Sequence, residues 1–207
     1  MRELEIATAR LLLTAPRLDQ AAAMLDFVTR NREHLKPWSP ATPPNFYTLA
    51  HLQEMVGKHT DAFENGSAVR FWISSNDDLG RIIGSIGFSQ ISRGPFCSCV
   101  LGYQIDRECE GKGLMNEALR AAMQYLFEEQ KMHRIAANYQ PANVRSGRLL
   151  TKLGFRIEGF AKDYLFIDGA WCDHILTSRV NDQFSGDISM AGWKNESPLN
   201  ASAPTAK

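Results

Sequence analysis

The chain has 207 residues, of which 44% are apolar and 22% are charged, the balance of an ordinary globular protein with material for one buried core. Its formal net charge is zero and its pI is about 7.0, so the overall charge gives no sign of a dedicated nucleic-acid-binding protein. Residues 1–10 lack the apolar core of a signal peptide, and no apolar run is long enough to span a bilayer. We therefore expect a cytoplasmic protein without a membrane partner.

The N-terminal part of the chain predicts one strand and two helices. Residues 10–14 have strand composition, and a helix capped near Asp19 is expected to follow. Residues 34–44 contain four prolines and are expected to be irregular, because proline cannot continue a helix. A second helix is predicted over residues 48–64, where an Asn-Gly pair ends the helical pattern.

The following elements are strands and helices in alternation. Three strands are predicted first, at residues 69–74, 81–89 and 99–105. The apolar spacing then changes to the helical period over residues 114–126. The last predicted elements are a strand at 134–139, a helix at 143–153 and two strands at 155–166 and 171–178.

This order of elements predicts one mixed α/β domain over residues 1–181. Residues 182–207 are rich in Ser, Gly, Asn, Pro and Ala with few large apolar residues, and we expect them to form a flexible tail. The four cysteines lack the spacing of a zinc site, and we expect free thiols and no metal: Cys97, Cys99, Cys109 and Cys172.

The strongest chemical pattern is a strand that runs through a glycine-rich loop into a helix, within residues 100–126. The first amides of a helix have no partner inside the helix, and the helix dipole adds positive potential there. Gly111 and Gly113 would let such amides approach an anion, and Lys112 would add charge. An ordinary strand-to-helix turn would carry the same residues. The dinucleotide and P-loop patterns are both absent, so a phosphate site here would belong to another class.

Two segments together resemble the GNAT superfamily of N-acetyltransferases. Residues 110–115 are similar to its pyrophosphate loop, usually Q/R-x-x-G-x-G/A, and residues 143–155 are similar to its N-x-x-S…L-x-x-x-G-F segment. The resemblance extends over residues 8–180. It implies the acyl-CoA N-acyltransferase fold, in which helices flank a largely antiparallel central sheet, and it implies acetyl-CoA as the co-substrate.

Further segments resemble the RimJ/RimL branch of that family, and RimJ is the nearer: residues 35–38, 133–139, 145–147 and 161–165. The resemblance implies direct transfer of the acetyl group to the N-terminal amine, alanine in the RimJ type, of a small-subunit ribosomal protein. Association with the ribosome and the choice between monomer and dimer stay open.

Two departures from the pattern keep other functions open. Glu110 stands where the family has Gln or Arg, and its carboxylate would repel a pyrophosphate; Met115 replaces the last small residue. The alternatives are a GNAT enzyme acetylating another peptide or a small-molecule amine, and a catalytically weak CoA-binding regulatory module.

The resemblance also assigns site residues. The residues implied in binding acetyl-CoA are Tyr103, Ile105, Gly111, Lys112, Gly113, Leu114, Met115, Asn143, Arg145 and Ser146. Asn143 is in addition a predicted helix cap. Ser146 would return a proton to the leaving thiolate, although a serine in a first helical turn needs no such role. Glu158 would be the general base, directly or through water, and its alternative is an exposed strand carboxylate.

The acceptor groove is predicted from three aromatic residues, Trp38, Tyr139 and Tyr164. The resemblance places Trp38 in the acceptor loop between the first two helices. A role as packed core aromatics is the alternative for all three.

Overall fold

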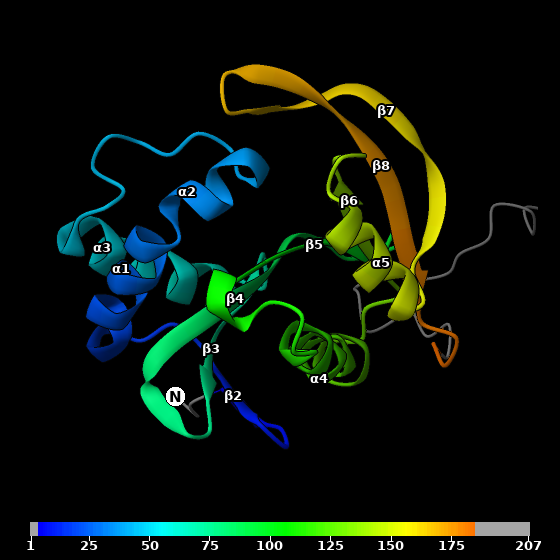
Figure 1. Ribbon diagram of the computed structural model, residues 1–207. Coiled ribbons are helices and arrows are strands. Elements are labelled where there is room, and N and C mark those ends of the chain that lie inside the picture. Colours follow the sequence, from blue (N-terminus) through cyan, green and yellow to red (C-terminus); the bar gives the residue numbers. More distant parts are fainter. Residues whose placement is uncertain (1–3, 185–207) are drawn as a thin grey trace, which may run out of the picture.

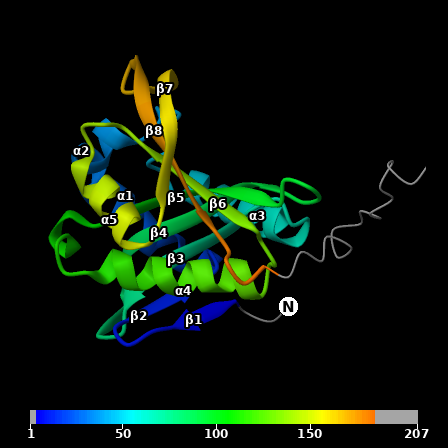
Figure 2. The ribbon, with the colours of Figure 1, turned by 90° about the vertical axis from the view of Figure 1, so that its right-hand side faces the viewer.

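The computed structural model describes residues 4–184, in which one eight-stranded sheet carries helices on both of its faces (Figures 1 and 2). The strands are β1 (Glu5–Ala7), β2 (Leu11–Thr14), β3 (Val69–Ser75), β4 (Asp78–Ser92), β5 (Ser98–Ile105), β6 (Arg134–Tyr139), β7 (Arg156–Ile167) and β8 (Ala170–Val180). The helices are α1 (Ala21–Arg30), α2 (Arg32–Leu35), α3 (Leu49–Glu64), α4 (Leu114–Glu128) and α5 (Val144–Lys152), with 3-10 turns η1 (Leu18–Gln20), η2 (Lys36–Trp38) and η3 (Arg107–Cys109).

The strands lie in the order β1-β2-β3-β4-β5-β6-β8-β7. Only β5 and β6 are parallel, and all other neighbours are antiparallel. The prediction of a mixed α/β domain with a largely antiparallel sheet is therefore confirmed.

Alternating side chains of the sheet feed two separate cores. On β3, Phe71 and Ile73 face the core that contains Leu119 of α4, while Trp72 between them joins the core of α1 and α3. Figure 2 shows α4 lying along one face of the sheet. Because successive strand residues point to opposite faces, the continuous apolar run on β3 marks a strand buried on both sides.

β5 and β6 pair only over their first three residues and then diverge. Ser98 to Val100 lie beside Arg134 to Ala136. Beyond that point β5 continues to pair with β4 as far as Ile105, and β6 continues with β8 as far as Tyr139. The backbone groups that face each other across this opening have no partner strand, so the fold leaves a backbone-lined gap in the middle of its sheet.

Several boundaries differ from the sequence predictions. β1 was not predicted; it is a three-residue edge strand with little pattern to detect. α1 begins at Ala21 without a side-chain cap, and Asp19 lies in the preceding η1 turn, so the predicted cap is wrong. The segment expected to be irregular begins with α2 and η2, where Pro37 takes an early helical position that needs no N–H donor.

The predicted C-terminal tail falls from residue 185 onward outside the described residues. Within residues 4–184, no helix is both long enough and apolar enough to cross a bilayer.

Candidate active site

The glycine loop, residues 110–113, brings the chain from η3 to the first turn of α4. Gly111 and Gly113 have φ of 73° and 76°, in the left-handed region that favours glycine. Gly113 is the N-cap of α4 and no side chain caps the helix, so its first amides stay available to an anion. A Cβ on Gly111 would meet nothing within 4 Å, which leaves open space beside the loop.

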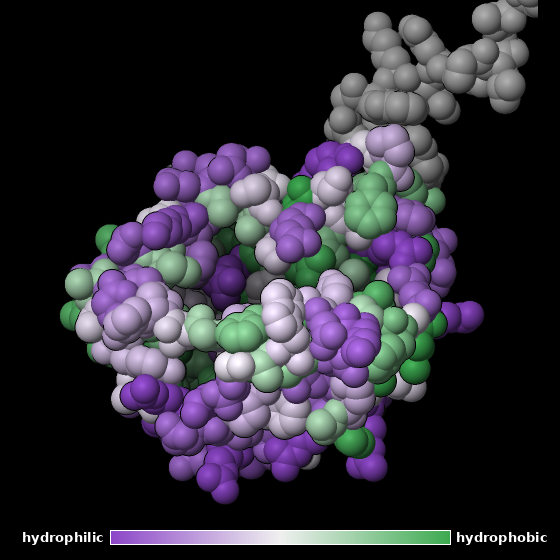
Figure 3. Space-filling view, turned by 90° about the horizontal axis from the view of Figure 1, so that it is seen from above, coloured by the Kyte–Doolittle hydropathy of each residue, from purple (hydrophilic) through white to green (hydrophobic). Residues whose placement is uncertain are grey.

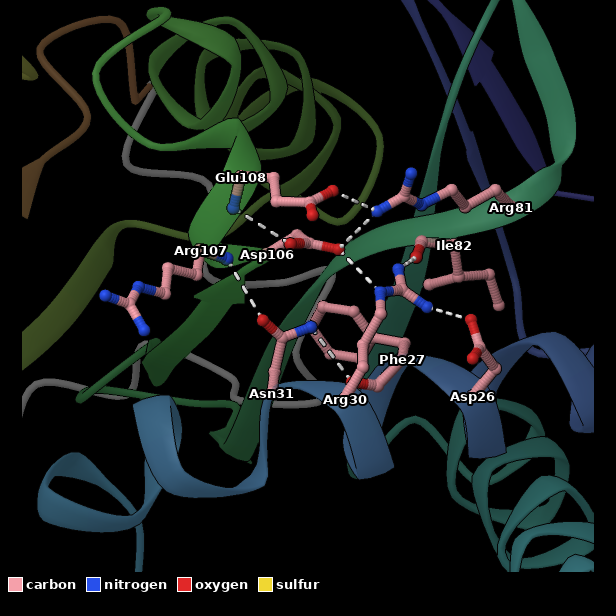
Figure 4. A network of polar contacts seen from close by, with 9 residues as sticks. All are labelled: Asp26, Phe27, Arg30, Asn31, Arg81, Ile82, Asp106, Arg107 and Glu108. Atoms are coloured by element: carbon pink, nitrogen blue, oxygen red, sulfur yellow. Dashed lines mark hydrogen bonds and ion pairs between the residues drawn. The ribbon is translucent and has the colours of Figure 1, made fainter.

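Asp106, between β5 and η3, holds the approach to the glycine loop in place (Figure 4). Its side chain is 2% exposed, and its carboxylate accepts hydrogen bonds from the Glu108 amide at 3.0 Å and from Arg30 Nε at 2.7 Å. Arg81 Nη2 adds a third contact at 3.3 Å. Asn31 completes the network by accepting from the Arg107 amide at 3.0 Å. The network ties α1 and β4 to the segment that leads into the loop.

Burial alone would raise the pKa of the Asp106 carboxyl. The hydrogen bond from the Glu108 amide and the Arg30 guanidinium outweigh burial, so this pKa lies below its ordinary value. Asp106 is thus a buried carboxylate that stays ionised at neutral pH.

A second anchor joins the start of α4 to the edge of β2. Glu117 accepts hydrogen bonds from Thr8 Oγ1 at 2.7 Å and from Arg10 Nε at 2.7 Å. Arg10 in turn donates to the Lys112 carbonyl at 3.1 Å, inside the glycine loop. Arg10 therefore holds the Lys112 carbonyl in place, while the amides of the loop stay free to bind an anion.

The carboxylate of Glu110 is paired. Arg145 on α5 donates to one carboxylate oxygen, and His34 Nε2 lies 3.3 Å from the other. Arg145, expected at the CoA phosphates, is thus engaged with the residue that departs from the family pattern. This pairing reduces the negative charge that the glycine loop would present to a pyrophosphate.

The predicted residues Tyr103 and Ser146 meet at the gap between β5 and β6. Tyr103 lies on the diverging part of β5, and its hydroxyl is 2.6 Å from Ser146 Oγ in the first turn of α5. Asn143 accepts a hydrogen bond from the Ser146 amide at 3.1 Å, which confirms the predicted helix cap. Burial raises the pKa of Tyr103 to about 12, so its hydroxyl is protonated at neutral pH and can donate.

Gly147 explains how α5 comes so close to the end of β6. A Cβ at this position would lie 2.8 Å from the Tyr139 ring, closer than any side chain tolerates. Tyr139 therefore packs directly against the first turn of α5, and its place in the acceptor groove stays a prediction. Sequence reasoning did not assign Gly147 a role.

Trp38 and Tyr164 line the opposite face of the sheet, near the end of β6. The Pro37 carbonyl beside Trp38 accepts from Gln140 Nε2 at 2.9 Å. Tyr164 on β7 accepts from Asn138 Nδ2 at 3.0 Å. Trp38 and Tyr164 are 39% and 40% exposed, so both present ring surface to solvent beside the gap.

The hairpin of β7 and β8 arches over this face and touches the η2 segment at its tip (Figure 1). Lys36 Nζ lies 3.4 Å from Asp168 Oδ1, and Pro40 forms a β-bridge with Ile167. Seen from above, the surface is hollowed beside this crossing (Figure 3). The contact closes a frame around the face on which an acceptor would approach.

Glu158 does not lie with these groups. Its carboxylate accepts hydrogen bonds from Arg134 and from Ser178 Oγ, the latter at 2.7 Å. Hydrogen bonds from these two residues lower the pKa of Glu158, which makes it a weaker base. Arg134 begins β6 and Tyr139 ends it, a separation of roughly 16 Å at the usual rise per residue. The geometry favours the alternative stated for Glu158, a carboxylate on an exposed strand with a structural partner.

Comparisons with known proteins identify the family of the chain. Residues 10–156 match the family described as "Acetyltransferase (GNAT) domain". The "[Ribosomal protein uS5]-alanine N-acetyltransferase" of Escherichia coli K12 is 43% identical over 176 residues, covering 85% of this chain and 90% of the relative. The "Probable N-acetyltransferase YjcK" of Bacillus subtilis is 34% identical, covering 76% and 86%.

Solved structures have the same fold. The ribosomal-protein-S5-alanine acetyltransferase of Vibrio fischeri superposes with a TM-score of 0.83 at 34% identity, covering 87% of this chain and 98% of the other. Mycobacterium smegmatis RimJ, in complex with CoA-disulfide, gives a TM-score of 0.79 at 26% identity, with 87% of each chain covered.

A sheet that opens between two parallel strands, with an uncapped helix N-terminus beside the opening, defines an acyl-CoA-dependent acyltransferase. The chain belongs to the GNAT family of acetyltransferases. It is an N-acetyltransferase that uses acetyl-CoA, and the resemblance to the RimJ/RimL branch is confirmed.

The residues present fit this co-substrate. The free amides of α4 and the left-handed glycines suit a pyrophosphate, and the backbone-lined gap suits an extended pantetheine arm. Bound acetyl-CoA supplies an activated thioester for direct attack by an amine.

Proposed function

We propose that this enzyme acetylates the N-terminal alanine of ribosomal protein uS5 in the cytoplasm. The observation that carries the proposal is the Tyr103–Ser146 pair at the mouth of the gap between β5 and β6, in a chain 43% identical to an enzyme named for this reaction. In this proposal the thiolate leaves beside the pair, and the acceptor approaches from the other side of the sheet.

The amides of residues 111–115, in the glycine loop and at the start of α4, bind the pyrophosphate, and Lys112 adds positive charge. Backbone amides of the diverging part of β5, at Tyr103 and Ile105, polarise the thioester carbonyl. Ser146 donates a proton to the departing sulfur while Tyr103 donates to Ser146, and the proton that the acceptor amine releases through water restores the Tyr103 hydroxyl.

The acceptor amine needs only modest help to lose its proton. An α-amine has a reference pKa of about 7.7–8.0, so roughly a tenth of it is neutral at pH 7, whereas a lysine amine at about 10.4 is almost wholly charged. Water can take the proton, and this proposal gives Glu158 no catalytic role. The site should therefore favour N-terminal amines over lysine side chains.

The groove between Trp38 and Tyr164, under the arch of β7 and β8, receives the extended N-terminus of the substrate. An extended chain suits this frame because it exposes its first residue at the gap while the following residues lie along the aromatic rings. The proposal includes contact with the ribosome only because the substrate is a ribosomal protein.

A competition assay tests the proposed acceptor. One peptide begins with alanine and the uS5 sequence, and a matched peptide is N-terminally blocked and contains an internal lysine. Released CoA thiol should be measured for each peptide. The proposal expects kcat/KM at least about tenfold higher for the free alanine terminus. Equal or faster reaction of the lysine would move a side-chain or small-molecule amine ahead as the natural acceptor.

The structure removes the reason for considering a CoA-binding module without activity. That alternative rested on an unpaired Glu110 beside the pyrophosphate, and Glu110 is paired with Arg145 and His34. Absence of thiol release with every amine, despite tight CoA binding, would revive it.

A further inference from the structure

A second cavity lies on the far side of β4 from the active site, between α3 and the edge of the sheet. Its volume is about 250 Å³, and at ~30 Å³ per water it holds a small organic molecule rather than a single ion. The lining comes from α3, from Arg70 on β3 and from the chain that surrounds β1 and β2. None of these residues takes part in the acetyl-transfer site.

Arg70 is the main polar group of this cavity. Its guanidinium lies against Gly87 on β4, where a Cβ would come within 3.1 Å of Nη2. Among residues 4–184 no carboxylate or carbonyl hydrogen-bonds to it. Burial lowers the pKa of Arg70, yet arginine remains charged at any physiological pH. A mostly buried cation without an anion is costly to fold, which is the physical motive for a ligand here.

His59 on α3 adds a second unsatisfied group. Its Nδ1 is fully buried and has no hydrogen-bond partner among the described residues. Burial, assisted by the Arg70 charge, lowers the pKa of His59 to about 4, so the ring is neutral at physiological pH and carries one N–H. Two groups that lack partners thus share one wall of the cavity.

The charges and the apolar lining limit what could bind. Glu5 also lines the cavity, but Arg17 Nη1 lies 3.8 Å from its carboxylate, so Arg70 is left as the excess positive charge. The rest of the wall is largely apolar: Leu4, Ala15, Pro16 and Phe63. One net positive charge next to apolar walls suits a monoanion that carries an apolar body.

We propose that this cavity is a binding site for a small organic carboxylate, whose charged group pairs with Arg70 beside the His59 ring and whose apolar body packs against Phe63 and Leu4. The site is independent of the acetyl acceptor, because β4 and β5 separate it from the gap that takes acetyl-CoA. The carboxylate of the ligand supplies the anion that Arg70 lacks among the described residues.

The test uses hexanoate as the probe, with the full chain saturated with CoA so that the active site is already filled. Hexanamide has the same tail without the charge, and acetate has the charge without the tail. Calorimetry and thermal unfolding should show saturable hexanoate binding, at least about tenfold tighter than either control, because the site needs both parts. Equal binding of hexanamide, or no saturable binding of hexanoate, would overturn the proposal.

Variants locate the binding. Arg70→Met should lose hexanoate binding by at least about tenfold while its ligand-free Tm stays equal to or above that of the wild type, since an unpaired buried cation has been removed. Arg156→Gln, an exposed strand arginine outside the cavity, is the matched control and should bind normally. Undiminished binding to Arg70→Met would refute the site.

A measurement on the wild type covers the case in which Arg70→Met fails to fold. Hexanoate should shift the ring resonances of His59 in NMR spectra at saturating CoA, and hexanamide should not. Unchanged His59 resonances at saturating hexanoate would exclude this cavity as the site.

Discussion

Single hydroxyl groups carry the proposed chemistry, and the Tyr103–Ser146 contact is the one to test first. Ser146→Ala should lower kcat by about 10²-fold, at the low end of general-acid effects because Tyr103 and water can substitute. The KM for acetyl-CoA should change little, since the thiolate exists only as the thioester breaks. Steady-state kinetics measures both values.

A matched control lies on the same helix. Thr151 also carries a hydroxyl on α5, which donates to the Gly147 carbonyl at 3.0 Å. Thr151→Ala should leave kcat unchanged. Wild-type kcat in Ser146→Ala, or an equal loss in Thr151→Ala, would reduce Ser146 to a residue of the helix.

Glu158 gives a second prediction at the residue scale, opposite to the one its sequence context suggests. Glu158→Gln should keep the acidic limb of the pH profile of kcat/KM, because the carboxylate is bound to Arg134 and Ser178. Loss of that limb would restore Glu158 as the base.

The same variant should cost stability only slightly. The carboxylate is 46% exposed, so its ion pair is worth less than ~1 kcal/mol. Because the pKa of Glu158 is lowered in the folded chain, this contribution is present above the ordinary carboxyl pKa and is lost as the pH falls through the folded value. Chemical unfolding at two pH values measures it.

At the scale of elements, the glycine loop makes a prediction about CoA affinity. Gly113→Leu should weaken CoA binding by about tenfold or more, since its φ of 76° is strained for leucine and the side chain would lie beside the free amides of α4. Gly66→Leu is the control, because Gly66 has φ of 71° in the turn after α3, away from the gap. Calorimetry that finds equal losses, or none, would contradict the placement of the pyrophosphate.

The buried carboxylate between β5 and η3 predicts a stability effect. Asp106→Asn should lower the free energy of unfolding by about 2 kcal/mol at pH 7, less than for a fully buried pair because Arg30 and Arg81 are partly exposed. The folded pKa of Asp106 is lowered, so its charge stabilises the fold above the ordinary carboxyl pKa and ceases to do so as the pH falls through the folded value.

Denaturant unfolding as a function of pH checks this prediction. The difference in unfolding free energy between the wild type and Asp106→Asn should become smaller as the pH falls below about 4. A free-energy difference that is independent of pH would mean that the effect of the substitution is steric rather than electrostatic.

How far the sequence predicts the site depends on the sequence separation of the contacts. The left-handed glycines and the Asn143 cap are local, so their residue types and spacing were sufficient. The Asp106–Arg30 pair joins residues 76 positions apart, and the Glu117–Arg10 pair joins residues 107 apart. No local pattern marks such partners. The partner of Glu158 could not be predicted for the same reason, since Arg134 lies 24 positions away.

At the scale of the whole molecule, the sheet separates the binding of acetyl-CoA from the binding of the acceptor. α4, α5 and the gap between β5 and β6 form the side suited to acetyl-CoA, while η2 and the arch of β7 and β8 frame the opposite side. The largely antiparallel sheet was implied by the family resemblance, and the closing contact between Pro40 and Ile167 was not. The segment after η2 and the tip of the β7–β8 hairpin are far apart in the sequence, so they meet only once the sheet is formed.

As a whole, the molecule should act as an enzyme that transfers acetyl groups to one N-terminal amine. The most direct measurement incubates the purified enzyme with acetyl-CoA and intact ribosomal protein uS5, then locates the added acetyl group by peptide mass spectrometry. We expect a single acetyl group on the N-terminal alanine and none on lysine side chains. Acetylated lysines with an unmodified N-terminus, or a uS5 protein left unacetylated, would contradict it.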